Sequence, residues 1–326
     1  MSVSVSAKCL AISGGVGGAK LALGFAHYLA PEQLLVVANT GDDFVHLGLP
    51  ICPDLDTVMY TLAGINNKEL GWGQAGESWH FLAALRALGG EHWFALGDRD
   101  LATHIQRQQL LGSGLSLSAA TASLCRSLGI PQALIPMTDD KVATIVHQQA
   151  GEPLAFQHYF VRDRCAPVVT GFEFSGIQAA APSAGFMAGL RDPDLGAIVI
   201  CPSNPFVSVD PVLALPGVLD AMAAAPAPVI AVSPIVGGLA IKGPAAKMMA
   251  ELGMPQSALA VAGHYQGRID GFVIDTTDEA LAPAIEALGI PTIVTNTVMV
   301  TLADRIELAA RVLMFARQLS ARSASA

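Results

Sequence analysis

Short apolar runs rich in β-branched residues alternate along the chain with longer stretches rich in Ala and Leu. Six of the runs predict strands: Lys8–Ser13, Leu34–Asn39, Gly196–Cys201, Pro228–Ser233, Gly271–Asp275 and Thr292–Thr295. Each is followed by a loop and then by a helical stretch. Runs that are apolar at every position are typical of strands buried on both faces of a parallel sheet. The pattern therefore predicts an α/β fold with a doubly wound, mostly parallel sheet.

The stretch between the second and third predicted strands has a different pattern. Residues 57–128 look mostly helical, and Val142–His147 and Pro153–Val161 flank Gly151 as the two arms of a hairpin would. No internal repeat and no low-complexity linker divides the chain. We therefore expect one domain, 1–326, with an α/β core at about 1–56 and 177–326 and a helical and hairpin insertion at about 57–176.

The amino-acid composition excludes some classes of protein and of ligand. Of the 326 residues, 52% are hydrophobic and 14% are charged, which excludes a disordered chain. The net charge of −9 argues against a nucleic-acid-binding face, but backbone amides or a metal could still hold an anionic small ligand. The five cysteines form no CxxC pair, which disfavours a structural zinc site and fits a reducing compartment.

The longest uncharged run, Ala221–Ile241, has the length of a membrane span. Three prolines and a Gly-Gly pair interrupt it, so a helix end, a buried strand and a loop explain it better. No signal peptide is visible at Met1–Ala7. We expect a cytoplasmic protein with no membrane partner.

A glycine-rich segment follows the first predicted strand and opens a helix. Gly14, Gly15, Gly17, Gly18 and Lys20 belong to it. The segment does not fit the P-loop, because Ala19 stands at the second glycine position and Leu21 at the Ser/Thr position. It does not fit the dinucleotide fingerprint either, since Lys20 takes the place of the third glycine. A phosphate-binding turn of another type is favoured, and a tight strand–helix turn is the alternative.

Two pairs of aspartates come next. Asp42 and Asp43 follow the second strand, and Asp54 and Asp56 open a helix in the segment Pro-Asp-Leu-Asp-Thr that ends at Thr57. Paired carboxylates at strand ends can hold a hard divalent cation, and one of them could deprotonate a hydroxyl nucleophile. Each aspartate alone could equally be a helix cap or an Asx turn.

Later polar segments offer further candidates. Asp98, Arg99, Asp100, Thr103 and His104 stand close together, with Arg107 just beyond. They form either an ion-pair cluster on a helix or a site wall where an arginine meets a phosphate or a deprotonated ring. Asn204, Ser233 and Gly237 follow later strands, where they suit nucleotide recognition or simple turns. For Trp72, Trp79 and Trp93, we expect core packing rather than ring stacking.

Together these segments resemble a known family, that of 2-phospho-L-lactate transferases of deazaflavin coenzyme F-420 biosynthesis (CofD in archaea, FbiA in actinobacteria). The similarity rests on five segments in this order: Ser-Gly-Gly-Val-Gly-Gly-Ala-Lys (13–20), Cys-Pro-Asp-Leu-Asp-Thr (52–57), Gly-Asp-Arg-Asp-Leu-Ala-Thr-His (97–104), Pro-Ser-Asn-Pro (202–205) and Ser-Pro-Ile (233–235). The second and third are specific, whereas the glycine loop alone would not be.

The resemblance implies a Rossmann-like α/β core with an added helical region, usually as a homodimer. It implies magnesium-dependent transfer of a phospho-acid (2-phospholactyl, phosphoenolpyruvyl or 3-phosphoglyceryl) from its guanosine diphosphate-activated form. The acceptor is the ribityl hydroxyl of the deazaflavin Fo (7,8-didemethyl-8-hydroxy-5-deazariboflavin), and GMP leaves. An upstream guanylyltransferase would make the donor.

The resemblance and the residues together suggest roles. We expect Mg²⁺ at Asp42, Asp43, Asp54 and Asp56, with Asp56 and Asp43 as the catalytic pair and Asp56 orienting the hydroxyl. The phosphates and nucleotide would lie along Gly14, Gly15, Gly17, Gly18, Lys20, Asn204, Ser233 and Gly237. We expect the deazaflavin to be bound by Asp56, Thr57, Asp98, Arg99 and Thr103.

Two other readings compete with the transferase. A sugar-nucleotide-binding regulatory protein of the same superfamily would bind nucleotide without turnover. Such proteins carry a Gly/Ser-rich stretch after the first Asp pair, where this chain has Phe-Val-His-Leu (44–47). A nicotinamide oxidoreductase is disfavoured by the missing third glycine.

Overall fold

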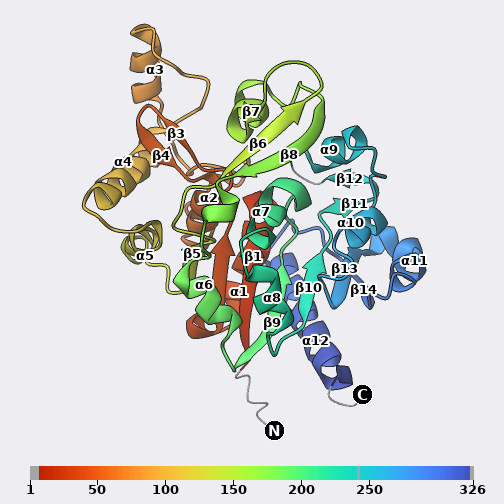
Figure 1. Cartoon of the computed structure of the whole chain (residues 1–326). Coiled ribbons are helices and arrows are strands. Elements are labelled where there is room, and N and C mark those ends of the chain that lie inside the picture. Colours follow the sequence, from red (N-terminus) through yellow and green to blue (C-terminus); the bar gives the residue numbers. More distant parts are fainter. Residues whose placement is uncertain (1–6, 241–242, 324–326) are drawn as a thin grey trace.

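The computed structural model describes residues 7–240 and 243–323, which include a seven-stranded parallel sheet (Figure 1). Its strand order is β14-β13-β10-β9-β1-β2-β5, and every neighbouring pair is parallel. The strands are β1 (Lys8–Ser13), β2 (Leu34–Ala38), β5 (Ala133–Pro136), β9 (Leu195–Ile200), β10 (Val229–Val232), β13 (Gly271–Asp275) and β14 (Thr292–Thr295). The predicted α/β, Rossmann-like, doubly wound sheet is confirmed, and all six predicted strands are in it.

Helices cover both faces of the sheet. The α-helices are α1 (Gly15–Tyr28), α2 (Pro53–Leu62), α3 (His80–Ala87), α4 (Asp98–Gly112), α5 (Leu117–Ser127), α6 (Ala184–Leu190), α7 (Asp210–Leu213), α8 (Val218–Ala223), α9 (Ala245–Glu251), α10 (Ala258–His264), α11 (Ala282–Glu286) and α12 (Leu302–Ser323). Short 3₁₀ or π turns are η1 (Pro31–Gln33), η2 (His158–Arg162), η3 (Ile177–Ala179), η4 (Pro205–Val209) and η5 (Thr276–Leu281).

The strand side chains divide between two cores. Along β1, Leu10 and Ile12 join one buried cluster while Cys9 and Ala11 join the other, as the two-residue period of a strand requires. The first cluster packs under α6, α8 and α10, and the second under α1, α2 and α12. Burial on both faces explains why these strands are apolar at every position.

Smaller sheets stand above the carboxyl edge of the main sheet, at the end of the molecule away from both termini (Figure 1). They are the hairpin β3 (Phe44–His46) and β4 (Leu49–Ile51), the hairpin β11 (Ile235–Val236) and β12 (Leu239–Ala240), and the sheet β7 (Leu154–Ala155), β6 (Ala143–Gln148) and β8 (Val169–Ser175). The hairpin predicted around Gly151 is confirmed for β6 and the two residues of β7. The rest of its predicted second arm, to Val161, is wrong because the chain turns into η2 there, and β8 supplies the long antiparallel partner of β6.

The segment predicted as an insertion, 57–176, is not separate from the core throughout. Most of α2 lies in it and packs against the sheet through buried Val58 and Met59, and β5 returns to pair with β2. The prediction missed β5 because four residues ending in a proline give almost no periodic signal. In the described part of the chain, no helix is both long and apolar enough to span a membrane.

Candidate active site

The chain order reverses between β1 and β9, the place where open parallel sheets bind ligands. The glycine loop follows β1 here, and Gly14 is the N-cap of α1. Gly15 has a φ of +61°, and its amide donates to Asp54 Oδ1 at 2.6 Å. A Cβ on Gly17 would lie 2.2 Å from the Pro202 carbonyl oxygen. The loop therefore needs glycine both for its backbone conformation and for its close approach to the segment after β9.

Other contacts show which amides of this loop are taken. The Gly14 amide donates to Ser203 Oγ at 3.0 Å, and a Cβ on Gly18 would lie 2.7 Å from the same oxygen. With Gly15 bound to Asp54, the first-turn amides of Val16 and Gly17 are the ones suited to an anion. Lys20, predicted beside the phosphates, instead donates to the Met299 carbonyl at 3.1 Å.

Asp54 connects the glycine loop to the segment after β2. It lies in the first turn of α2, buried, where Pro53 starts the helix. Its second carboxylate oxygen, Oδ2, accepts from Asn39 Nδ2 at 2.9 Å. Burial raises the pKa of Asp54 to about 6, although the bonds from Asn39 and Gly15 oppose the rise.

Asp42, Asp43 and Asp54 form what we call the acid cluster. Burial raises the pKa of Asp42 well above its usual value, and the charges of Asp54 and Asp43 add to the rise. Burial also raises the pKa of Asp43, while a hydrogen bond from the Cys52 thiol lowers it. Asp42 Oδ1 and Asp43 Oδ1 are buried with no hydrogen-bond partner. Since unpaired buried carboxylates are strongly unfavourable, the acid cluster is suited to protons or to a cation.

The donor chemistry of the acid cluster fits Mg²⁺, which prefers carboxylate oxygens and keeps several waters. In 7–240 and 243–323, no three Asp, Glu, His or Cys side chains already converge as metal ligands. Asp42 and Asp43 nevertheless keep unpartnered oxygens, and the charge of Asp54 is close enough to act on both of their pKa values. Asp42 and Asp43 are therefore the residues with oxygens available to the ion, and Asp54, whose two oxygens accept from Gly15 and Asn39, adds its charge beside them.

Asp56 lies outside this set. Its carboxylate makes a two-pronged ion pair with the buried Arg107, Oδ2 to Nη1 at 3.1 Å and Oδ1 to Nη2. Asp54 and Asp56 are two residues apart in α2, so they point to different sides of the helix. With both oxygens on Arg107, Asp56 is poorly placed to ligate a metal or take a proton, contrary to the expectation for it.

Three of the residues expected on the deazaflavin side bind neighbouring backbone or side chains. Asp98 accepts from Ser78 Oγ at 2.5 Å and from the amides of His80 and Phe81, and so fixes the start of α3. Arg99 donates to the Ala75 carbonyl, and Thr103 Oγ1 accepts from Gln74. These contacts brace the loop before α3. Thr57 lies half-buried in α2, close to the acid cluster in sequence.

Two of the three residues expected near the nucleotide also have turn contacts. Ser233 Oγ bonds the backbone of Ile235 in a buried turn, and Asn204 caps η4 through the Phe206 amide. The Gly237 amide donates to both oxygens of Asp278, at 3.1 and 3.2 Å. All three residues lie at the carboxyl edge, as predicted, but their polar groups already have partners.

An aromatic cluster that sequence reasoning missed lies next to Asp43. Phe44, His46, Trp93, Phe94 and His158 form it, with ring centroids between 5.0 and 6.2 Å apart. His46 Nε2 is buried there without a hydrogen-bond partner. Its members come from three segments distant in sequence, so no local pattern reveals the cluster. Phe44 directly follows Asp43, so the aromatic cluster begins one residue after the acid cluster.

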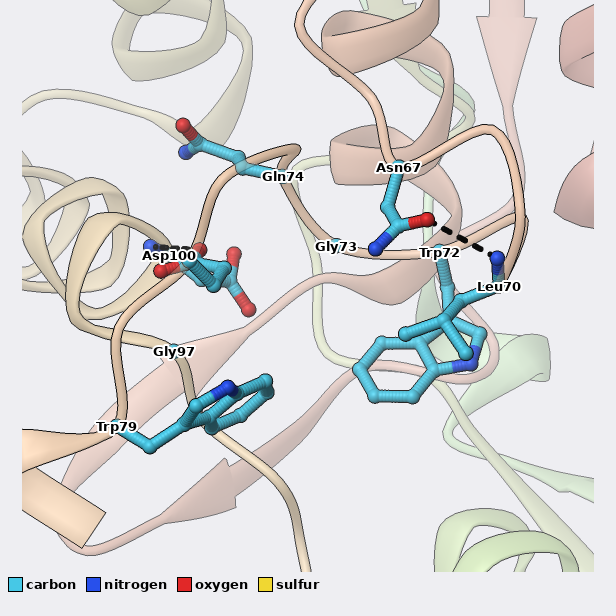
Figure 2. A pocket seen from close by; sticks show the side chains of 9 residues that line it. Asn67, Leu70, Trp72, Gly73, Gln74, Trp79, Gly97 and Asp100 are labelled. Carbon is cyan, nitrogen blue, oxygen red and sulfur yellow. Dashed lines mark hydrogen bonds between the residues drawn. The ribbon is translucent and has the colours of Figure 1, made fainter.

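The other two tryptophans are not in the core, contrary to expectation. Trp72 is 44% and Trp79 41% exposed. Figure 2 shows both around a small cavity that Asp100 also lines, with the Leu70 amide bonded to Asn67. Its volume of about 10 Å³ suits a single water rather than a substrate.

The acid cluster predicts an unusual pH dependence of stability. The pKa of Asp54 is about 6 in the folded protein against an ordinary value of 3.8, so the folded state binds more protons between these values. The contribution of Asp54 to stability is therefore fully present below pH 3.8 and is lost as pH rises through 6. We expect the Tm of metal-free protein to fall by about 4 °C between pH 5 and pH 7.5 in differential scanning fluorimetry.

Mg²⁺ should reverse much of that fall, because the ion replaces the lost protons. A matched control is Asp54→Asn, whose Tm should vary less with pH. A wild-type Tm that is flat from pH 5 to 7.5 and unaffected by Mg²⁺ would contradict the assignment.

Comparison with known proteins adds sequence evidence. Residues 9–311 match the family described as "2-phospho-L-lactate transferase CofD". A protein named phosphoenolpyruvate transferase from Kitasatospora aureofaciens is 41% identical over 317 residues, covering 95% of this chain and 98% of its own. Proteins of the same name from Streptomyces coelicolor and Mycobacterium tuberculosis are 42% and 36% identical, over 87% and 89% of this chain and 90% and 94% of their own.

Among solved structures, a member of the UPF0052 family from Bacillus halodurans shares the fold. The TM-score is 0.60 at 12% identity, over 94% of this chain and 98% of that one. At this identity the similarity concerns the fold alone.

Proposed function

Because this chain belongs to the CofD family of 2-phospho-L-lactate transferases, we propose that it transfers a phospho-acid to the deazaflavin Fo. The donor is the acid linked through its phosphate to GMP, and phosphoenolpyruvate is the favoured acid because the similar transferases carry that name. The observation that carries the proposal is the acid cluster beside the glycine loop at the switch point of the sheet.

The reaction is a displacement at phosphorus. The ribityl hydroxyl oxygen of Fo attacks the phosphorus that bears the acid, and the bond from that phosphorus to the bridging oxygen breaks. GMP leaves with the electron pair of that bond, and the hydroxyl proton passes to a carboxylate. Such a reaction depends on positioning and on neutralising charge more than on covalent help.

The residues divide this work between them. Asp43 has an unpartnered Oδ1, as Asp42 does, but is less buried, and it is the group that takes the proton from the acceptor hydroxyl. Asp54 holds the glycine loop in place through Gly15, and the amides of Val16 and Gly17 face the diphosphate. Asp42 and Asp43, with the charge of Asp54 beside them, would hold Mg²⁺, which would neutralise charge on the diphosphate.

The aromatic cluster is the proposed site of the deazaflavin ring. It begins at Phe44, directly after Asp43, so a ring stacked there would place the ribityl chain near the acid cluster. This differs from the expectation that Asp98, Arg99 and Thr103 contact the ring, because those side chains hold the loop before α3.

A turnover assay tests the function. Purified protein is mixed with Fo, Mg²⁺ and a guanylylated enolpyruvyl, lactyl or glyceryl donor, and mass spectrometry follows the adduct of Fo. We expect an adduct with the enolpyruvyl donor at the highest rate. No adduct with any donor, together with tight binding of a guanosine or uridine nucleotide, would favour a regulatory protein instead.

Replacing Trp93 with Leu is expected to raise the KM for Fo about tenfold and to change the KM for the donor little, since base–aromatic stacking contributes about 1–3 kcal/mol. Trp79→Leu is the matched control, because Trp79 lies outside the aromatic cluster. Steady-state kinetics with each substrate varied decides the point. Equal KM values for Fo in both variants would contradict the proposal that the deazaflavin ring binds at the aromatic cluster.

A further inference from the structure

A buried ionic contact links α4 to the segment that carries the acid cluster. Arg107 is 1% exposed and reaches across from α4. Besides its ion pair with Asp56, its Nη1 lies 3.4 Å from the Pro50 carbonyl in β4. Pro50 belongs to the β3–β4 hairpin and Asp56 follows it, and Figure 1 shows α4 beside that hairpin. One guanidinium therefore binds two points of the segment 42–56.

Polar side chains of α4 and α2 also lie on the side of Arg107 away from Pro50. Its Nη1 lies 3.2 Å from His104 Nδ1, and His104 Nε2 lies 3.3 Å from Asp100 Oδ2. Tyr60 Oη donates to Asp100 Oδ1 at 2.6 Å. Arg107 Nη1 is therefore within hydrogen-bond distance of the imidazole, whereas His104 Nε2 is buried without a hydrogen-bond partner. His104 thus contacts the guanidinium from behind, with Asp100 and Tyr60 beside it.

Fold stability alone does not account well for this arrangement. Removing a guanidinium and a carboxylate from water costs several kcal/mol per ion, and an apolar pair often serves the fold as well or better. Burial alone would lower the pKa of Arg107, yet Asp56 keeps it above its usual value, so the charge is permanent. That charge is also felt by Asp43, whose pKa it lowers against the effect of burial.

We propose that Arg107 is a positioning residue for the transfer reaction, holding the segment 42–56 so that Asp43 and Asp54 face the same reacting atoms. The proposal rests on the function proposed above. Arg107 acts through Asp56 and Pro50 rather than on substrate, because its side chain is buried and its terminal nitrogens face these groups. Asp56, in turn, acts as the carboxylate through which Arg107 holds the start of α2.

Arg107→Lys tests the proposal because it keeps the charge and loses the two-pronged geometry. We expect its kcat to fall about 30-fold or more, with KM for both substrates within about threefold of wild type. Arg107→Met, which also loses the charge, should fall further, so that Lys rescues part of the activity. The control is Lys8→Met, which removes an ion pair with Asp192 at the opposite edge of the sheet and should leave kcat unchanged.

Folding is measured on the same samples by circular dichroism and Tm. The proposal is overturned if folded Arg107→Lys keeps a wild-type kcat, or if the loss in Arg107→Met only follows its unfolded fraction. A second readout is independent of turnover: the rise in Tm caused by Mg²⁺ should be at least halved in Arg107→Lys. If wild-type protein forms no adduct of Fo, the proposed function fails. In that case the rise in Tm caused by Mg²⁺ still tests the role of Arg107. A rise in Arg107→Lys as large as in wild type overturns that role.

Discussion

Replacing Asp54 with Asn should lower kcat by about 10³ while the protein stays folded, the largest loss of activity we expect from one substitution. Asn keeps the size of the side chain and can still accept from the Gly15 amide. Its own amide group would meet that of Asn39, donor against donor, and the negative charge beside Asp42 and Asp43 would be gone. The cation site and the glycine loop would be disturbed together.

The measurement is kcat at saturating donor, Fo and Mg²⁺. Asp270→Asn is the matched control, because Asp270 also binds a backbone amide, that of Val229, but at the opposite edge of the sheet. Its kcat should equal that of wild type. If the Asp54→Asn protein kept more than about a tenth of wild-type kcat, the claim that the reaction depends on Asp54 would be contradicted.

Replacing Gly17 with Ala should cause a large loss of stability. The added Cβ would lie 2.2 Å from the Pro202 carbonyl oxygen, which is backbone and cannot rotate away. Either α1 or the segment after β9 must shift. We expect the free energy of unfolding to fall by about 2–3 kcal/mol and kcat to fall at least tenfold, because both moved segments line the site.

Denaturant unfolding measures the first effect and turnover the second. Gly263→Ala in α10 is the control, since a Cβ there meets nothing within 4 Å. It should stabilise the protein by up to about 1 kcal/mol, as Ala does over Gly inside a helix. A Gly17→Ala protein as stable as Gly263→Ala would show that the close approach to Pro202 does not matter.

The sequence predicted the sheet well because its strands are buried on both faces and leave a strong apolar signal. Cys9 and Leu10 point to opposite cores, yet both are apolar. The strand β5 carried no such signal, since it has four residues and a proline. Its place beside β2 depends on where the chain returns after α5, which no local pattern encodes.

The site was predicted in part for a similar reason. Strand ends meet at one edge of a parallel sheet, so Asp42, Asp43 and Asp54 could be expected together. The sequence could not tell Asp54 from Asp56, because the choice depends on which side of α2 faces Arg107, a residue 51 positions further on. The aromatic cluster was missed because Phe44, Trp93 and His158 meet only in three dimensions.

The most direct test of the central claim is to measure, in one time course, the GMP and the Fo adduct that purified protein forms from Fo and guanylylated phosphoenolpyruvate. We predict equal amounts of the two, formed only with Mg²⁺ and with the adduct bearing the phospho-acid. An adduct that bears GMP instead, or GMP released without any adduct, would contradict the claim.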